Sequence, residues 1–223
     1  MAASESGAER RARLQAARLY LVVGSAPEPH TLPDLLRAAA AGGVDIVELR
    51  EKDLPDGELA AVANAARALC ERIGLLLTID DRPAVALEVG ADGVHLGEGD
   101  MAAAAARELL GPDVLIGRSA HSEEEIAAAD PAVVDYISVG PVHESLTKPG
   151  RAPVGTVLVR YAATHARVPF FAVGGLDAGN VSTALDGGAQ RVAVSRAVAA
   201  AQDPERAARA IREQLGAAPE VRP

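Results

Sequence analysis

Short apolar runs alternate with longer, alanine-rich segments along the chain. The short runs are rich in β-branched residues and have strand lengths, whereas the longer segments space their apolar residues as amphipathic helices do. We predict strands at Leu19–Val23, Ile46–Arg50, Leu75–Ile79, Gly93–Leu96, Leu115–Ser119, Tyr136–Gly140, Phe170–Gly174 and Arg191–Val194. We predict helices over residues 33–41, 57–73, 82–89, 101–110, 122–129, 154–166, 178–187 and 203–215. Such alternation is typical of parallel strands joined by helical crossovers.

Eight repeats of one strand–helix unit favour a closed (β/α)8 TIM barrel over an open sheet. No linker divides the 223 residues, so we expect a single catalytic domain over 18–216. Residues 1–17 are predicted to form an N-terminal segment whose extra helix, about 8–17, covers the lower end of the barrel. Residues 217–223 are expected to be a tail.

Several predicted helices have recognisable start and stop residues. Asp56, Ser122 and Asp203 are each expected to cap the helix that follows them. Gly42 and Gly74 are expected to end the first and second helices. The one long connection, 141–153, is polar, and long loops in compact domains are usually functional.

Composition narrows the partners of the protein. Apolar residues make up 49% of the chain, but there are only five aromatic residues, so we expect a core of Ala, Val, Leu and Ile. A net charge of −9 and few aromatic residues argue against a nucleic-acid partner, and no apolar run is long enough for a membrane span. A single cysteine, Cys70, suits a reducing compartment, so we expect a cytoplasmic protein. A homo-oligomer is compatible with the sequence.

In this architecture, chemistry is expected at the C-terminal ends of the strands. Alternation directs Glu48, Arg50 and, at the strand end, Lys52 towards the barrel mouth. An arginine in such a place needs an anion as partner, which is either a bound substrate or an ordinary structural salt bridge.

Acidic residues follow the next two strands. Asp80 and Asp81 end the third strand, and Asp100 comes shortly after the fourth. Asp81 and Asp100 have a plain alternative as helix N-caps. Because the two strands are neighbours, however, their carboxylates can share one hard cation, and Mg²⁺ favours one or two carboxylates with phosphate oxygens. We therefore predict a magnesium site.

The remaining strand ends offer anion-binding groups. Ser119 and His121 follow the fifth strand; Ser119 can donate to a phosphate, and His121 can act as acid–base or bind local backbone. The long connection supplies Ser145, Thr147 and Lys148, which suit a loop over an anion. His95, within the fourth strand, is expected to be a structural histidine.

Glycines mark the last two strand ends. Gly174 and Gly175 follow the seventh strand, and Ser195 and Arg196 follow the eighth. Loops at these two positions commonly form the phosphate site of a TIM barrel through backbone N–H groups. We predict a phosphate site there.

As a set, these motifs resemble the thiamine phosphate synthase family from Leu19 to about residue 215. The matching stretches are residues 47–52, 80–82, 92–97 with Asp100, 117–119, 147–150 and 173–175. The resemblance implies a magnesium-dependent transferase that joins 4-amino-5-hydroxymethyl-2-methylpyrimidine pyrophosphate to a thiazole phosphate and releases pyrophosphate. It implies no side-chain nucleophile.

The resemblance also assigns roles by position. The pyrophosphate is expected at Arg50, Lys52, Ser119 and Lys148, which are the implied catalytic residues. The metal is expected at Asp81 and Asp100. The other residues implied in substrate binding are Glu48, Asp80, Ser145, Thr147, Gly175, Ser195 and Arg196.

The chain departs from the family pattern in one direction. The family normally has Gln, Asn and Gln where this chain has Glu48, Asp80 and Glu98, so three amides become acids beside a site for polyanions. The rival interpretations are a thiazole tautomerase of the same fold that uses His121, another phosphate-binding barrel enzyme, and a non-catalytic binding protein.

Overall fold

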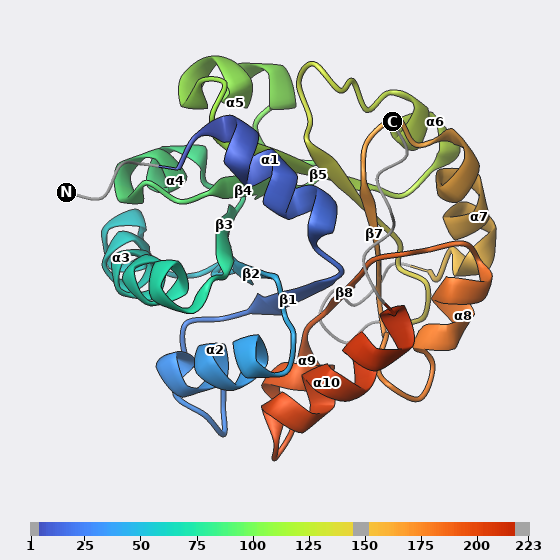
Figure 1. The fold of residues 1–223 in the computed structure, drawn as a ribbon. Helices are drawn as coiled ribbons and strands as arrows, with labels where there is room; N and C mark the ends of the chain where they lie inside the picture. Colours follow the sequence, from blue (N-terminus) through green and yellow to red (C-terminus); the bar gives the residue numbers. More distant parts are fainter. Residues whose placement is uncertain (1–4, 145–151, 217–223) are drawn as a thin grey trace.

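The structure, a computed structural model, describes residues 5–144 and 152–216. Eight parallel strands pair in chain order from β1 to β8, and β8 pairs with β1 to close the barrel. Helices surround the strands (Figure 1). The predicted (β/α)8 barrel is therefore confirmed. No helix within the described ranges is long and apolar enough to cross a membrane.

The strands lie within one residue of their predicted bounds at each end. They are β1 Leu19–Val23, β2 Ile46–Leu49, β3 Leu76–Asp80, β4 Gly93–Leu96, β5 Leu115–Ala120, β6 Tyr136–Val139, β7 Phe170–Val173 and β8 Val192–Val194. The helices are α1 Gly7–Ala16, α2 Leu32–Ala41, α3 Asp56–Ile73, α4 Pro83–Val89, α5 Ala103–Leu110, α6 Glu123–Ala127, α7 Gly155–His165, α8 Val181–Asp186, α9 Arg196–Ala199 and α10 Pro204–Leu215. Helix α9, a single turn, was not predicted from the sequence.

Most of the predicted helix ends are confirmed. The side chains of Ser122 and Asp203 accept hydrogen bonds from the first turns of α6 and α10. Gly42 and Gly74 follow α2 and α3 as expected. The prediction for Asp56 was wrong: α3 begins at Asp56 itself after Pro55, without a side-chain cap. An acid in the first turn still stabilises the positive end of the helix dipole.

Two hydrophobic cores lie on either side of the strands. The outer core, between strands and helices, is almost entirely aliphatic, as predicted. The inner core is different, because Tyr20, Tyr136 and Phe171 pack against one another inside the barrel, with ring centroids 5.3–5.9 Å apart. The expectation of an aliphatic interior was therefore wrong for the inside of the barrel.

Helix α1 closes the lower end of the barrel, as predicted, and crosses it in Figure 1. Leu14, near its end, packs into the inner core. Its arginines bind acids that precede strands: Arg10 Nε lies 3.1 Å from Asp92 Oδ1, and Arg11 Nε lies 2.7 Å from Asp135 Oδ1. With this end sealed, the opposite end is left for a site.

Candidate active site

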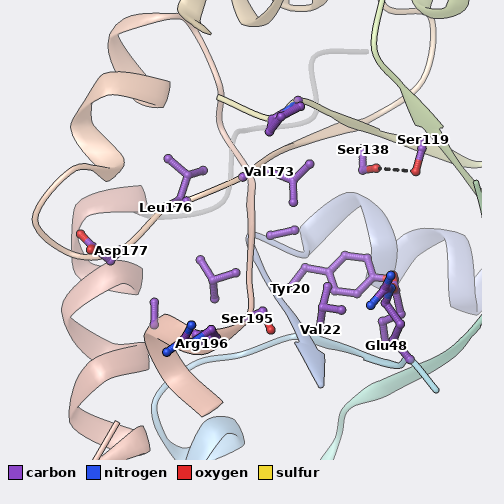
Figure 2. Close-up of a pocket in the computed structure, with 18 of the residues that line it drawn as sticks. Tyr20, Val22, Glu48, Ser119, Ser138, Val173, Leu176, Asp177, Ser195 and Arg196 are labelled. Atoms are coloured by element: carbon purple, nitrogen blue, oxygen red, sulfur yellow. Dashed lines mark hydrogen bonds between the residues drawn. The ribbon is translucent and has the colours of Figure 1, made fainter. Parts of the chain in front are cut away.

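A cavity of about 410 Å³ opens among residues at the C-terminal ends of the strands. Six of the predicted site residues line it: Glu48, Arg50, Ser119, Gly175, Ser195 and Arg196. In Figure 2, Tyr20, Glu48 and Ser119 lie on one side of the cavity, and Leu176 and Asp177 lie on the other. The structure therefore brings the ends of these strands together around one cavity, as predicted from the sequence.

The floor of the cavity is a buried hydrogen-bonded network that the sequence did not reveal. The Tyr20 hydroxyl donates to Glu48 Oε2 at 2.8 Å, and lies 2.7 Å from Thr78 Oγ1 and 3.0 Å from the Tyr136 hydroxyl. Burial raises the pKa of both Tyr20 and Tyr136, and the charge of Glu48 adds to this. Both phenols therefore remain neutral, and the Tyr20 hydroxyl fixes the Glu48 carboxyl group.

His95 continues this network to the serines. Its Nδ1 lies 3.3 Å from the Tyr136 hydroxyl, and its Nε2 lies 3.1 Å from Ser119 Oγ and 3.3 Å from Ser138 Oγ. His95 is thus hydrogen-bonded inside the barrel, as expected, but it also lines the cavity. One sequence pattern could have revealed this network. Glu48, His95 and Ser138 each stand three residues after an Asp that precedes β2, β4 or β6.

A charged cluster lies beside the cavity, at the ends of β2 and β3. Arg50 Nε and Lys52 Nζ lie 3.2 and 3.1 Å from Asp80 Oδ2, and Lys52 also pairs with Asp81. Neither Arg50 Nε nor Asp80 Oδ2 has an aligned hydrogen bond, so these are charge contacts. The cations expected to bind pyrophosphate are therefore held by acids of the protein itself.

Asp80 is almost completely buried, with 4% of its surface exposed. Burial, followed by the charge of Glu48, raises the pKa of Asp80 to about 6, although Lys52 acts in the opposite direction. Desolvation therefore exceeds the attraction of the neighbouring cations.

Neither Asp81 nor Asp100 is a helix cap. Helix α4 begins at Pro83 after Arg82, and α5 begins at Ala103 after Ala102, so both capping alternatives were wrong. Asp81 has a φ of 61°, and no other non-glycine residue in the described ranges has a positive φ. A residue whose backbone is held in this costly conformation is often functional.

The carboxylates of Asp81 and Asp100 border one small space next to Gly97. A Cβ added to Gly97 would lie 2.9 Å from Asp100 Oδ2 and 3.8 Å from Asp81 Oδ1. Asp100 Oδ2 also accepts the Gly97 N–H at 2.6 Å. Across residues 5–144 and 152–216, no three His, Cys, Asp or Glu side chains form a metal-binding group. The carboxylates of Asp81 and Asp100 alone suit an ion that takes its other ligands from water and phosphate.

The opposite side of the cavity is built from backbone and apolar side chains. Gly174 and Gly175 have φ values of 109° and 62°, and a Cβ on Gly175 would lie 2.6 Å from the Glu144 carbonyl oxygen. Only glycine fits this turn without strain. Ser195 precedes α9, and Leu176 forms an apolar wall.

His121 also lines the cavity. Its Nδ1 lies 2.5 Å from the Gly140 carbonyl oxygen. A carbonyl only accepts, so Nδ1 carries the proton in this contact. Lys52, Asp80, Asp81 and Asp100 do not line the cavity but stand beside it, and Ser145, Thr147 and Lys148 lie outside the described residues.

Comparison with known proteins identifies relatives over most of the chain. Residues 19–198 match the family described as thiamine monophosphate synthase. The chain is 44% identical over 201 residues to a thiamine-phosphate synthase of Thermus thermophilus, covering 89% of this chain and 97% of the relative. It is 46% identical over 198 residues to a thiamine-phosphate synthase of Nostoc sp., but covers only 56% of that longer protein.

A solved structure agrees with these matches. The thiamine phosphate pyrophosphorylase from Pyrococcus furiosus superposes with a TM-score of 0.81 at 30% identity, covering 92% of this chain and 97% of the other. A 3-hexulose-6-phosphate synthase superposes with a TM-score of 0.64 at 19% identity, which shows a shared fold alone.

Proposed function

Because this chain belongs to the thiamine monophosphate synthase family, we propose that it joins a pyrimidine pyrophosphate to a thiazole phosphate and releases pyrophosphate. The substrates would be 4-amino-5-hydroxymethyl-2-methylpyrimidine pyrophosphate and the phosphorylated thiazole, and the product thiamine phosphate. One observation carries the proposal: a pair of cations with acids stands beside one side of a single cavity, and a glycine turn lines the other side.

Arg50 and Lys52 would bind the pyrophosphate. Both already lie against a carboxylate oxygen, so their charged groups are oriented towards a place where an anion is held. Ser119 lies on the same side of the cavity and offers a hydroxyl. Lys148 and the loop hydroxyls of Ser145 and Thr147 stay in the proposal from sequence alone.

Asp81 and Asp100 would hold the magnesium ion. They fit it because two carboxylates border the space that Gly97 leaves open, and nothing larger than glycine leaves that space free. Bound there, the ion would supply positive charge to the leaving pyrophosphate.

The phosphate of the thiazole would bind at the turn of Gly175 and at the backbone of Ser195 and Arg196. Backbone N–H groups at the start of a helix favour anions, and the glycines allow a close approach. Leu176 and Val173 supply an apolar wall for a heterocycle.

The proposed reaction needs charge and position from the protein rather than a nucleophile. The pyrimidine amino group stabilises a cation at the exocyclic carbon, so the C–O bond breaks first and its electrons leave with pyrophosphate. The ring nitrogen of the thiazole then forms the new C–N bond. Arg50 and Lys52 stabilise the leaving charge, and the glycine turn fixes the second substrate for attack.

A coupled reaction with both substrates tests the proposal. Purified protein with magnesium is expected to release thiamine phosphate and pyrophosphate in equal amounts, measured by chromatography, and a chelator should stop the reaction. Arg50→Gln should lower the rate by about a hundredfold, the size expected for a lost transition-state contact. Arg37→Gln, an exposed arginine on α2, is the control. Absence of thiamine phosphate with both substrates and magnesium would refute the proposal.

One observation favours a second function. His121 lines the cavity with its Nδ1 proton held by Gly140, which is suitable for acid–base chemistry, so a thiazole tautomerase is the alternative. Proton exchange into the thiazole phosphate, followed by NMR in deuterated water, would detect it. Exchange lost in His121→Ala but retained in Asp81→Ala and Asp100→Ala would favour the tautomerase.

A further inference from the structure

Asp80 stands where an anionic ligand of the cationic pair would be expected. Its Oδ2 atom lies 3.2 Å from Arg50 Nε and 3.1 Å from Lys52 Nζ. A neutral amide at this position would carry no charge to attract the two cations, so the carboxylate is what holds them here.

The contacts of Asp80 are close but readily exchanged. Asp80 is buried, whereas the Lys52 side chain is 48% exposed and the Arg50 side chain is 19% exposed and borders the cavity. Neither Arg50 Nε nor Asp80 Oδ2 makes an aligned hydrogen bond. A charge-assisted hydrogen bond with good geometry is stronger than a misaligned charge contact. A mobile anion with several oxygens can therefore take over both cations.

We propose that Asp80 is an internal competitor for pyrophosphate, which holds Arg50 and Lys52 in the empty site and so sets how tightly pyrophosphate binds. This inference rests on the proposed function. When pyrophosphate arrives, the cations turn towards it, and the fixed Asp80 carboxylate remains close by and repels it. When pyrophosphate leaves, the two cations return to Asp80. No covalent step is involved, and Asp80 is a positioning residue.

A purely structural role for Asp80 would have other consequences. Loss of a structural ion pair would disorder Arg50 and Lys52, weaken pyrophosphate binding and raise KM for the pyrimidine substrate. Competition predicts the opposite sign, because the cations become available when the carboxylate is gone. The direction of the change in pyrophosphate affinity therefore distinguishes the two roles.

Titration calorimetry with inorganic pyrophosphate, with and without magnesium, is the test. Asp80→Asn keeps the shape and removes the charge, and we expect it to bind pyrophosphate about tenfold more tightly, the size of a one-unit electrostatic effect. Asp80→Ser should change the affinity in the same direction, which guards against a folding defect in one variant. KM for the thiazole phosphate should not change.

Glu51→Gln is the matched control. It removes one negative charge between Arg50 and Lys52 in the sequence, but the Glu51 carboxylate accepts the Ser25 N–H instead of facing the cations. Its pyrophosphate affinity should stay within about twofold, because this carboxylate is held by the Ser25 N–H and not by Arg50 or Lys52.

Two results would overturn the inference. Pyrophosphate could bind the Asp80 variants no more tightly than the unaltered protein, or Glu51→Gln could bind as tightly as Asp80→Asn, which would indicate a general charge effect. Failure of the proposed function is recognised separately, since it appears as no thiamine phosphate from the unaltered protein, whatever the pyrophosphate affinities are.

Discussion

The two sides of the barrel mouth differ in how their polar groups are satisfied. On the acidic side, the ends of β2 to β4, Arg50 and Lys52 pair with Asp80 and Asp81. On the glycine side, the ends of β7 and β8, the turn of Gly174 and Gly175 borders an open cavity with an apolar wall. The cations of the acidic side are therefore already paired with acids of the protein, whereas the glycine turn faces a cavity.

This difference predicts two kinds of binding. A ligand on the acidic side must replace contacts that the protein already makes, so its affinity is a difference between two charge interactions and depends on salt. A ligand on the glycine side meets a pre-formed turn and loses little in reorganisation. Variants on the two sides should therefore affect different substrates.

The largest effect is expected from removing the two carboxylates proposed to hold magnesium. Asp81→Ala and Asp100→Ala should each lower the rate of thiamine phosphate formation by about a hundredfold or more, because charge on the leaving group is no longer neutralised. The rate is measured over a magnesium titration, and the half-saturating concentration should rise.

The control for this prediction is Asp186→Ala, an exposed acid in α8, which should keep the rate of the unaltered protein. If Asp81→Ala and Asp100→Ala retained the full rate at low magnesium, the acidic side would hold only ion pairs. The contrast between the two sides would then be one of structure and not of chemistry.

A smaller effect, confined to the other substrate, is expected from Gly175→Ala. The added Cβ would lie 2.6 Å from the Glu144 carbonyl oxygen at a φ of 62°, so the turn must shift. KM for the thiazole phosphate should rise about tenfold, since about 1 kcal/mol or more of strain moves the phosphate donors. Steady-state kinetics with each substrate varied in turn measure this.

Gly74→Ala separates strain from binding. Gly74 also has a positive φ, 80°, but a Cβ there meets nothing within 4 Å, and it lies at the end of α3 away from the mouth. Both variants should lose stability, and only Gly175→Ala should change KM. An equal rise in KM for the pyrimidine pyrophosphate would show that the two sides are not independent.

Most of the fold could be predicted because branched apolar runs and alanine-rich helices alternate without interruption. The failures have physical causes. Helix α9 is one turn of four residues, too short to show a helical period. The aromatic interior was missed because composition does not say where a residue lies, and Tyr20, Tyr136 and Phe171 are far apart in the sequence.

The site was predicted in part. The topology of a barrel places strand ends together, so the residues at those ends could be identified from their positions alone. The pairing of Arg50 with Asp80 could not, because it joins side chains thirty positions apart whose directions depend on packing. The backbone of Asp81 was equally hidden, and the sequence left capping open where the structure excludes it.

The last expected effect concerns the stability of the protein and its pH dependence on the acidic side, not the rate. Burial raises the pKa of Asp80 from 3.8 to about 6. Between these two pH values, Asp80 is therefore protonated in the folded protein but ionised in the unfolded chain. The contribution of Asp80 to stability is therefore greatest below pH 3.8, falls as pH rises through this window, and is constant above about 6. In Asp80→Asn this fall is removed, because the amide resembles the protonated acid.

Urea unfolding in a chelating buffer at several values between pH 4 and 7.5 measures this difference without bound metal. The free energy of unfolding of Asp80→Asn, minus that of the unaltered protein, should increase with pH by up to about 3 kcal/mol. Asp186→Asn, which removes an exposed charge, should show no such slope. If this difference in unfolding free energy did not change with pH, Arg50 and Lys52 would fully compensate the cost of burying the Asp80 carboxylate. The acidic side would then be pre-organised for its ligand to the same degree as the glycine side.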